Sequence, residues 1–202
     1  MMTKKYGLVL GIGLTLVAGV GVLSLRAEET PAAPDVKKLA DSVGKKNWDE
    51  LSKEGEAVAK KYDDLLDIMH VFKPRSKDAK VSGVGIGDTP GTIIPDGIEQ
   101  KIIRMAGRVG VSETDIAKAP ALKRMAEISA AVAAAAVHKP NKDAPKSKED
   151  TQKWKDYSKE MHDASLDLIK ALEKKDRAQA KTAVTKLHGT CTKCHNDFRK
   201  DD

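Results

Sequence analysis

The chain is poor in cysteine and in aromatic residues. Only 2 of its 202 residues are cysteine, which excludes a small domain cross-linked by several disulfides. Aromatic residues make up 3% of the chain, and no segment alternates apolar and polar residues like a half-buried strand. No basic block interleaved with aromatics is present, so nothing indicates nucleic-acid binding. Abundant Ala, Lys, Glu and Asp, with apolar residues every three or four positions, predict an all-α chain.

Both cysteines lie in one pentapeptide, Cys191-Thr192-Lys193-Cys194-His195. Two thiols at this spacing can each add to one vinyl group of a haem, and the adjacent imidazole can then bind the iron. The motif therefore predicts one haem c, attached covalently through Cys191 and Cys194, with His195 as the proximal ligand.

Two other interpretations of the pentapeptide are weaker. A tetrahedral zinc site needs four ligands, and His188 is the only other nearby ligand, which would crowd the cluster into one helix. A redox dithiol usually lies at a helix N-terminus after a strand, and no such strand is visible here.

The N-terminus predicts export. Lys4 and Lys5 precede an apolar run over residues 7–25, which ends in Leu25-Arg26-Ala27. We expect residues 1–27 to be a signal peptide, with a membrane anchor as the alternative because the run is long. Residues 28–34 are expected to be a linker and residues 35–202 one domain. A periplasmic or otherwise exported location agrees with the motif, because c-type haem is attached outside the cytoplasm.

The charge of the exported part is close to neutral. The whole chain has a formal charge of +6, but without residues 1–27 it has 33 basic and 30 acidic residues. These charges alternate along the predicted helices, as on a solvated face.

Apolar periodicity predicts the helices. A helix is expected over residues 48–72, with Asn47 as N-cap, and a long Gly-rich loop follows over residues 73–97. A broken helical unit over residues 98–136 is interrupted at Gly110 and restarts at Ser112. A helix from Asp150, a turn at residues 174–176 and a last helix carrying the motif complete an antiparallel four-helix bundle, with a short additional helix over residues 35–44.

The motif and the residues after it resemble the class II c-type cytochromes, the cytochrome c-prime family. That family carries its haem motif near the end of the last helix and typically continues Cys-x-x-Cys-His-x-x-Tyr/Phe-Arg. Here Cys191 to Arg199 match that pattern without a gap, with Phe198 and Arg199 at its end. The specific resemblance covers residues 150–199, and the earlier part of the chain resembles the family only in architecture.

The resemblance implies roles for further residues. Phe198 would pack below the haem ring, and Arg199 would lie near the proximal imidazole and a propionate. The alternative for Arg199 is an interaction with the helix C-terminus and Asp202. Family members are often dimers, so a homodimer is one expectation.

The resemblance places the residue opposite His195 in the first helix of the bundle. Met69 lies on the apolar stripe of residues 48–72 and is the candidate sixth ligand, whereas His70 points about 100° away from it. Core packing is the alternative role for Met69. Of the remaining candidates, three methionines are assigned to the core: Met105, Met125 and Met161. His138 and His162 are expected to be exposed. His188 could touch a haem edge but is expected to face solvent.

Two functions are expected from these residues, and neither is enzymatic. A haem held by His195 and Met69 would transfer electrons to and from other exported redox proteins. With Met69 only lining the pocket, the iron would instead be five-coordinate and bind nitric oxide or carbon monoxide. A peroxidase is not indicated, because no distal His-Arg pair can be placed opposite His195.

Overall fold

The regular secondary structure of the described part of the chain is helical. The computed structural model describes residues 29–76, 81–141 and 146–199, so the expected signal peptide over residues 1–27 lies outside it. Within these ranges the only β feature is a single bridge between Glu29 and Ser82. The helices are α1 (Ala33–Ala40), α2 (Trp48–Ala59), α3 (Leu65–Met69), the 3₁₀ helix η1 (His70–Phe72), α4 (Ile98–Ala106), α5 (Glu113–Ala117), α6 (Ala119–Ala136), α7 (Lys148–Glu173) and α8 (Arg177–Phe198). The all-α prediction is confirmed.

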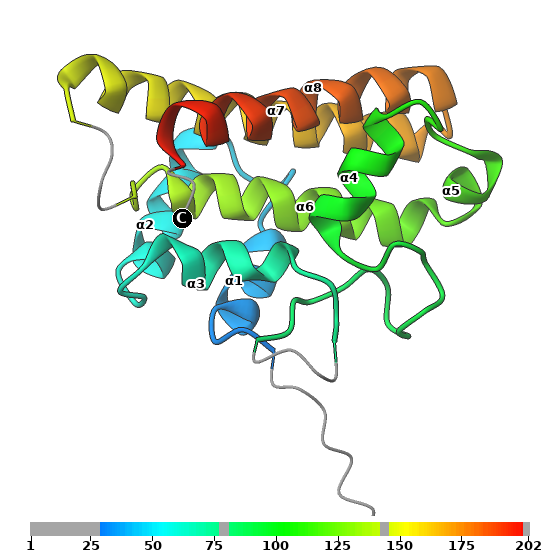
Figure 1. Cartoon of the computed structure of the whole chain (residues 1–202), viewed down its shortest axis with the longest axis horizontal. Helices are drawn as coiled ribbons and strands as arrows, with labels where there is room; N and C mark the ends of the chain where they lie inside the picture. The colour runs from blue at the N-terminus through cyan, green and yellow to red at the C-terminus, as the bar shows by residue number, and fades with distance from the viewer. Residues whose placement is uncertain (1–28, 77–80, 142–145, 200–202) are drawn as a thin grey trace, which may run out of the picture.

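Helix α6 lies at the centre of the bundle. Helices α7 and α8 run side by side along one side of it, and α1, α2 and α3 lie along the other (Figure 1). Of these, α2 has the most extensive packing against α6, and α4 packs against α8. None of the described helices is long and apolar enough to span a membrane.

The helix expected over residues 48–72 is interrupted, so that prediction is wrong in its middle. Its start is confirmed, because the Asn47 side chain accepts from the Glu50 backbone N–H at 3.0 Å in a capping box. However, α2 ends at Ala59, and Asp64 caps a new helix by accepting from the Leu66 N–H. The Asp64 carboxylate competes with the helix backbone for that N–H, and the spacing of apolar residues gives no indication of this competition.

The broken unit over residues 98–136 is confirmed at both signals. The backbone turns at Gly110, with φ +70°, and Ser112 and Asp115 form a capping box that starts α5. The first part of the unit ends before Gly110, however, because α4 stops at Ala106 and Val109 is 70% exposed. At the other end of the chain, α1 begins at Ala33, inside the segment expected as a linker, and Thr30 beside it is buried.

Helix α2 crosses α6 at a point of close backbone contact. A Cβ atom placed on Gly55 would lie 2.1 Å from the carbonyl oxygen of Ala134. Only glycine leaves room for this approach, because the obstacle is backbone that cannot rotate away. The crossing holds α2, and with it the start of α3, against the bundle.

We expect Gly55→Ala to lower the free energy of unfolding by about 1–3 kcal/mol, because the added methyl forces the two helices apart. Chemical denaturation of the purified protein measures the change. Gly189→Ala is the matched control, since Gly189 is also helical but a Cβ atom placed on it would have no atom within 4 Å. The control should gain up to about 1 kcal/mol from helix propensity. If Gly55→Ala has the same effect on the free energy of unfolding as Gly189→Ala, the close crossing is contradicted.

Candidate functional site

The turn between α7 and α8 sets where the motif lies. Lys175 adopts a left-handed conformation with φ +54°, and Asp176 caps α8 by accepting from the Gln179 N–H at 2.9 Å. The chain therefore reverses within three residues, and α8 packs antiparallel to α7. An ion pair between Lys193 and Glu160, at 2.9 Å, also links the two helices near the motif.

Cys191, Cys194 and His195 lie together on the last two turns of α8. Residues three and four apart on a helix share a face, so the two thiols and the imidazole are neighbours. All three residues are half-buried, and both thiols are free. Helix α8 ends just after them, where the Arg199 N–H donates to the His195 carbonyl oxygen at 2.9 Å.

The thiols have raised pKa values. Burial raises the pKa of Cys191 to about 11, and burial together with the charges of Cys191 and Asp197 raises the pKa of Cys194 to about 12. A redox-active dithiol requires the opposite shift, because the thiolate is the nucleophile. The environment of the two cysteines therefore argues against a dithiol oxidoreductase.

The imidazole of His195 is held neutral. Burial lowers its pKa, and the nearby positive charge of Arg199 lowers it further. A neutral imidazole has a free nitrogen lone pair, which is the form that binds a metal. The charge of Arg199 thus acts on the imidazole, its role beside a haem stays a prediction, and the alternative partner Asp202 lies outside the described residues.

Helix α4 brings an acidic residue to the motif that the sequence did not indicate. The Lys181 Nζ donates to the last carbonyls of α4, those of Ala106 and Gly107, at 2.5 and 2.6 Å. At the opposite end of α4, the negative charge of Glu99 acts on both Cys191 and His195. No local motif links Glu99 to the pentapeptide, so only the packing of α4 on α8 shows the proximity.

Phe198 is anchored to α7. Its side chain is 5% exposed, and its ring centroid lies 5.3 Å from that of Trp154 and 6.1 Å from that of Tyr157. Asn141 donates to its carbonyl oxygen at 3.3 Å. These contacts fix the end of α8, and packing of Phe198 below a haem ring stays a prediction.

Met69 lies at the end of α3, at the edge of the core. It is half-buried, while the neighbouring Ile68 and Val71 are fully buried, so the buried face is rotated from the expected stripe. Helix α3 packs against α6, and it lies towards the end of the molecule where α8 terminates (Figure 1). His70 is also half-buried, and burial lowers its pKa. The role of either side chain as an iron ligand stays a prediction.

The other candidate residues divide into core and surface. Met105 and Met125 are buried, and Met161 packs half-buried against the core. His138 is exposed, as predicted, and its Nε2 lies 2.8 Å from the Ser52 hydroxyl. His188 is half-buried.

His162 is buried, not exposed as predicted. It is 3% exposed, and its ring centroid lies 4.9 Å from that of Trp48. Its Nδ1 lies 3.0 Å from Oδ1 of the Asp163 carboxylate, whereas its Nε2 has no hydrogen-bond partner among the described residues. The start of α2 covers this face of α7, and the periodicity of α7 alone does not reveal that cover.

The donor set fits a haem c better than a zinc ion. Two thiols and a neutral imidazole share one face of α8, in surroundings apolar enough to raise the thiol pKa values. Within the described ranges, no group of three or more His, Cys, Asp and Glu side chains is placed to hold a metal ion. Covalent haem requires only this pair of thiols and one histidine from the protein.

Comparison with known proteins agrees with the donor set. Residues 101–199 match the family model described as Cytochrome C′. Over 54 residues the chain is 39% identical to a cytochrome c′ of Rhodospirillum rubrum, a match that covers 24% of this chain. The chain spans 37% of the length of that relative. No solved structure matches the chain. The segment matched by the family model contains Cys191, Cys194 and His195, whereas Met69 lies outside it.

Proposed function

Because the chain belongs to the cytochrome c′ family, we propose that it is an exported c-type cytochrome that transfers electrons through one covalently bound haem c. The observation that carries the proposal is the shared face of Cys191, Cys194 and His195 at the end of α8, inside the matched segment. Membership of the family supports a c-type haem protein. Electron transfer goes beyond that membership and is proposed here.

Each residue of the site has one task. Cys191 and Cys194 would hold the haem through two thioether bonds, and the neutral imidazole of His195 would bind its iron. Bound haem supplies a one-electron redox centre. Met69, at the end of α3, is proposed as the sixth ligand. A thioether ligand favours the reduced state and so raises the potential.

The proposed partners are other exported redox proteins. The described helices carry many exposed, paired charges, such as the ion pair between Lys123 and Glu173 at 2.6 Å. Without residues 1–27 the chain has 33 basic and 30 acidic residues. A surface of mixed sign suits brief, polar contacts with a partner rather than strong steering towards one sign of charge.

Gas binding is the second candidate function, and the position of Met69 favours it. Met69 is half-buried and lies outside the segment that matches the family. If its sulfur does not reach the iron, the site opposite His195 is open to nitric oxide or carbon monoxide.

Absorption spectra of the purified exported protein distinguish the two functions. They would be recorded in the ferric and ferrous states, before and after addition of carbon monoxide. A low-spin haem whose spectrum carbon monoxide leaves unchanged supports electron transfer with a sixth protein ligand. A high-spin haem that binds the gas supports the second candidate, and a protein without haem contradicts both.

Cys191→Ala is expected to leave one thioether bond at most. The haem would then be held only through Cys194, and the pyridine haemochrome spectrum would shift to that of a singly attached haem. Thr192→Ser is the control, because Thr192 lies between the cysteines but is exposed and bonds only within α8, to the His188 carbonyl oxygen. Two intact bonds in Cys191→Ala would refute the assignment of the motif.

A further inference from the structure

A cavity of about 840 Å³ lies between the loop that follows η1 and helices α1 and α6. Its volume falls in the range of small-molecule sites. Most of its lining precedes residue 101, so the part of the chain outside the family match builds it against α6. None of the proposed haem ligands is among the residues that line it.

The loop wall of the cavity is held in place by one arginine. Arg75 donates to both carboxylate oxygens of Asp96, at 2.6 and 2.7 Å, and to the carbonyl oxygens of Ile86 and Gly87. Gly85 has φ +67°, and a Cβ there would lie 2.0 Å from the Arg75 side chain. Arg75 is therefore committed to the wall and is not available to a ligand.

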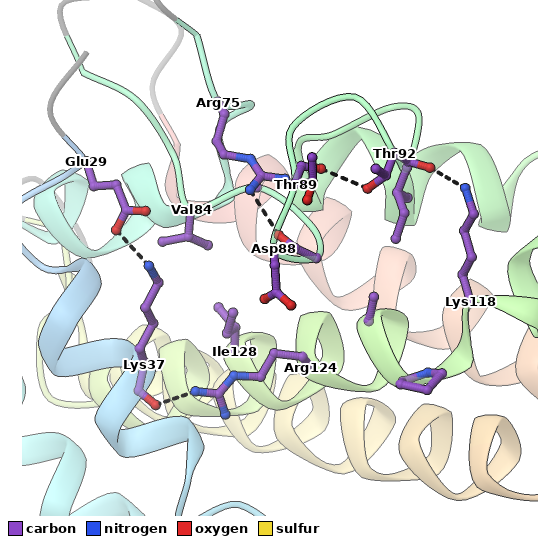
Figure 2. Close-up of a pocket in the computed structure, with 15 residues that line it drawn as sticks. Glu29, Lys37, Arg75, Val84, Asp88, Thr89, Thr92, Lys118, Arg124 and Ile128 are labelled. Atoms are coloured by element: carbon purple, nitrogen blue, oxygen red, sulfur yellow. Dashed lines mark hydrogen bonds and ion pairs between the residues drawn. The ribbon is translucent and has the colours of Figure 1, made fainter. Parts of the chain in front are cut away.

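Three other basic side chains surround the cavity (Figure 2). Lys37 pairs with Glu29 at 2.7 Å, at partly exposed positions. Arg124 pairs with the exposed Asp41 at 2.9 Å and with Glu127 at 3.2 Å, and it also donates to the Lys37 carbonyl oxygen at 2.8 Å. Lys118 donates to the Thr92 carbonyl oxygen and has no carboxylate partner among the described residues. Exposed ion pairs are weak, so Lys37 can exchange Glu29, and Arg124 can exchange Asp41, for a ligand at little cost. The bonds from Arg124 to Glu127 and to the Lys37 carbonyl oxygen keep its side chain at the cavity.

The remaining lining sets the shape and charge of a ligand. Apolar side chains line the cavity beside these cations: Val84, Ile93, Pro120, Ala121 and Ile128. Two acidic residues, Glu29 and Asp88, also line it, and Asp88 points into the space opposite α6 (Figure 2). Because Arg75 is neutralised by Asp96, three basic and two acidic side chains of the lining remain. This excess of one positive charge favours a single negative charge on the ligand and disfavours a polyanion such as a nucleotide.

We propose that this cavity binds a small organic monoanion with an extended apolar part. Its carboxylate or similar group would lie between Lys37 and Arg124, and its apolar part would lie along Ile128 and Val84. This site is separate from the haem motif on α8.

Isothermal titration of the full purified protein with dodecanoate tests the proposal. We expect saturable binding of one molecule, at least tenfold weaker binding of neutral dodecanol, and about fivefold weaker binding of dodecanoate to Lys37→Gln. Ala121→Trp, which fills the cavity without changing its charge, should abolish binding. Lys53→Gln is the control, because Lys53 is exposed on α2 and is not among the residues that line the cavity.

Four results would overturn the proposal. They are the absence of saturable binding, equal affinity for dodecanol, equal weakening in Lys53→Gln, and unchanged binding in Ala121→Trp, which would place the ligand elsewhere. Far-ultraviolet circular dichroism of each variant confirms that it is folded, so that lost binding reports on the cavity. Haem content plays no part in these readouts, and the proposed function can therefore fail or hold independently.

Discussion

Met69→Ala is expected to convert a low-spin haem that ignores carbon monoxide into a high-spin haem that binds it. Alanine has no donor atom, so the position opposite His195 would become open to the gas. The reduction potential should fall as well, because the thioether that favours the reduced state is lost. Absorption spectra with and without carbon monoxide, together with a redox titration, measure both effects.

Met161→Ala is the matched control for that experiment. Met161 is also a half-buried methionine that packs against the core, but it lies in the middle of α7. The same substitution there should lower stability and leave the spectrum unchanged. If Met69→Ala also leaves the spectrum unchanged, Met69 is core packing and not a ligand.

Asp115→Asn is expected to lower the free energy of unfolding by about 3–5 kcal/mol, because it leaves a buried lysine without its counter-charge. Asp115 and Lys101 are each 4% exposed in their side chains, and their charged atoms lie 2.7 Å apart. Arg104 bonds the same carboxylate, and Ser112 uses it to complete the cap of α5. This cluster joins α4 to α5. Chemical denaturation at neutral pH measures the loss.

The pH dependence gives a second readout for Asp115. Burial alone would raise the pKa of this carboxyl, but hydrogen bonds from Lys101, Ser112 and Arg104 outweigh it and hold the pKa well below its usual range. The folded state therefore binds this proton less readily than the unfolded state does. The stabilisation is complete above about pH 4 and is lost as the pH falls below it, and Asp115→Asn should lack that component.

Glu113→Gln is the control for the buried cluster. Glu113 also forms an ion pair with an arginine, Arg177, but its side chain is 82% exposed. The substitution should change the free energy of unfolding by less than about 1 kcal/mol. Equal effects of Asp115→Asn and Glu113→Gln would show that burial of the cluster contributes nothing.

Local signals in the sequence predicted the helix boundaries best where a cap or a breaker acts within one turn. Asn47 starts α2, Ser112 starts α5, and Gly110 separates α5 from α4, all as expected. The same kind of signal at Asp64 was overridden by the regular apolar spacing, and the break before α3 was missed. Apolar spacing reports which residues can be buried, and it does not report where a backbone donor finds a better acceptor.

Features that depend on packing between distant segments were not predictable from the sequence. His162 is buried because α2 brings Trp48 over it, and no residue of α7 encodes that contact. Glu99 reaches the motif because Lys181 fastens α4 to α8. The motif itself was predictable, because Cys191, Cys194 and His195 need only the geometry of one helix to lie together.

The mass of the purified exported chain under denaturing conditions tests the central claim most directly. If Cys191 and Cys194 hold a haem c, the intact mass is that of the polypeptide plus one haem, and neither cysteine reacts with a thiol reagent. A polypeptide without added haem, with both thiols free to react, would contradict the assignment of this chain as a functional c-type cytochrome.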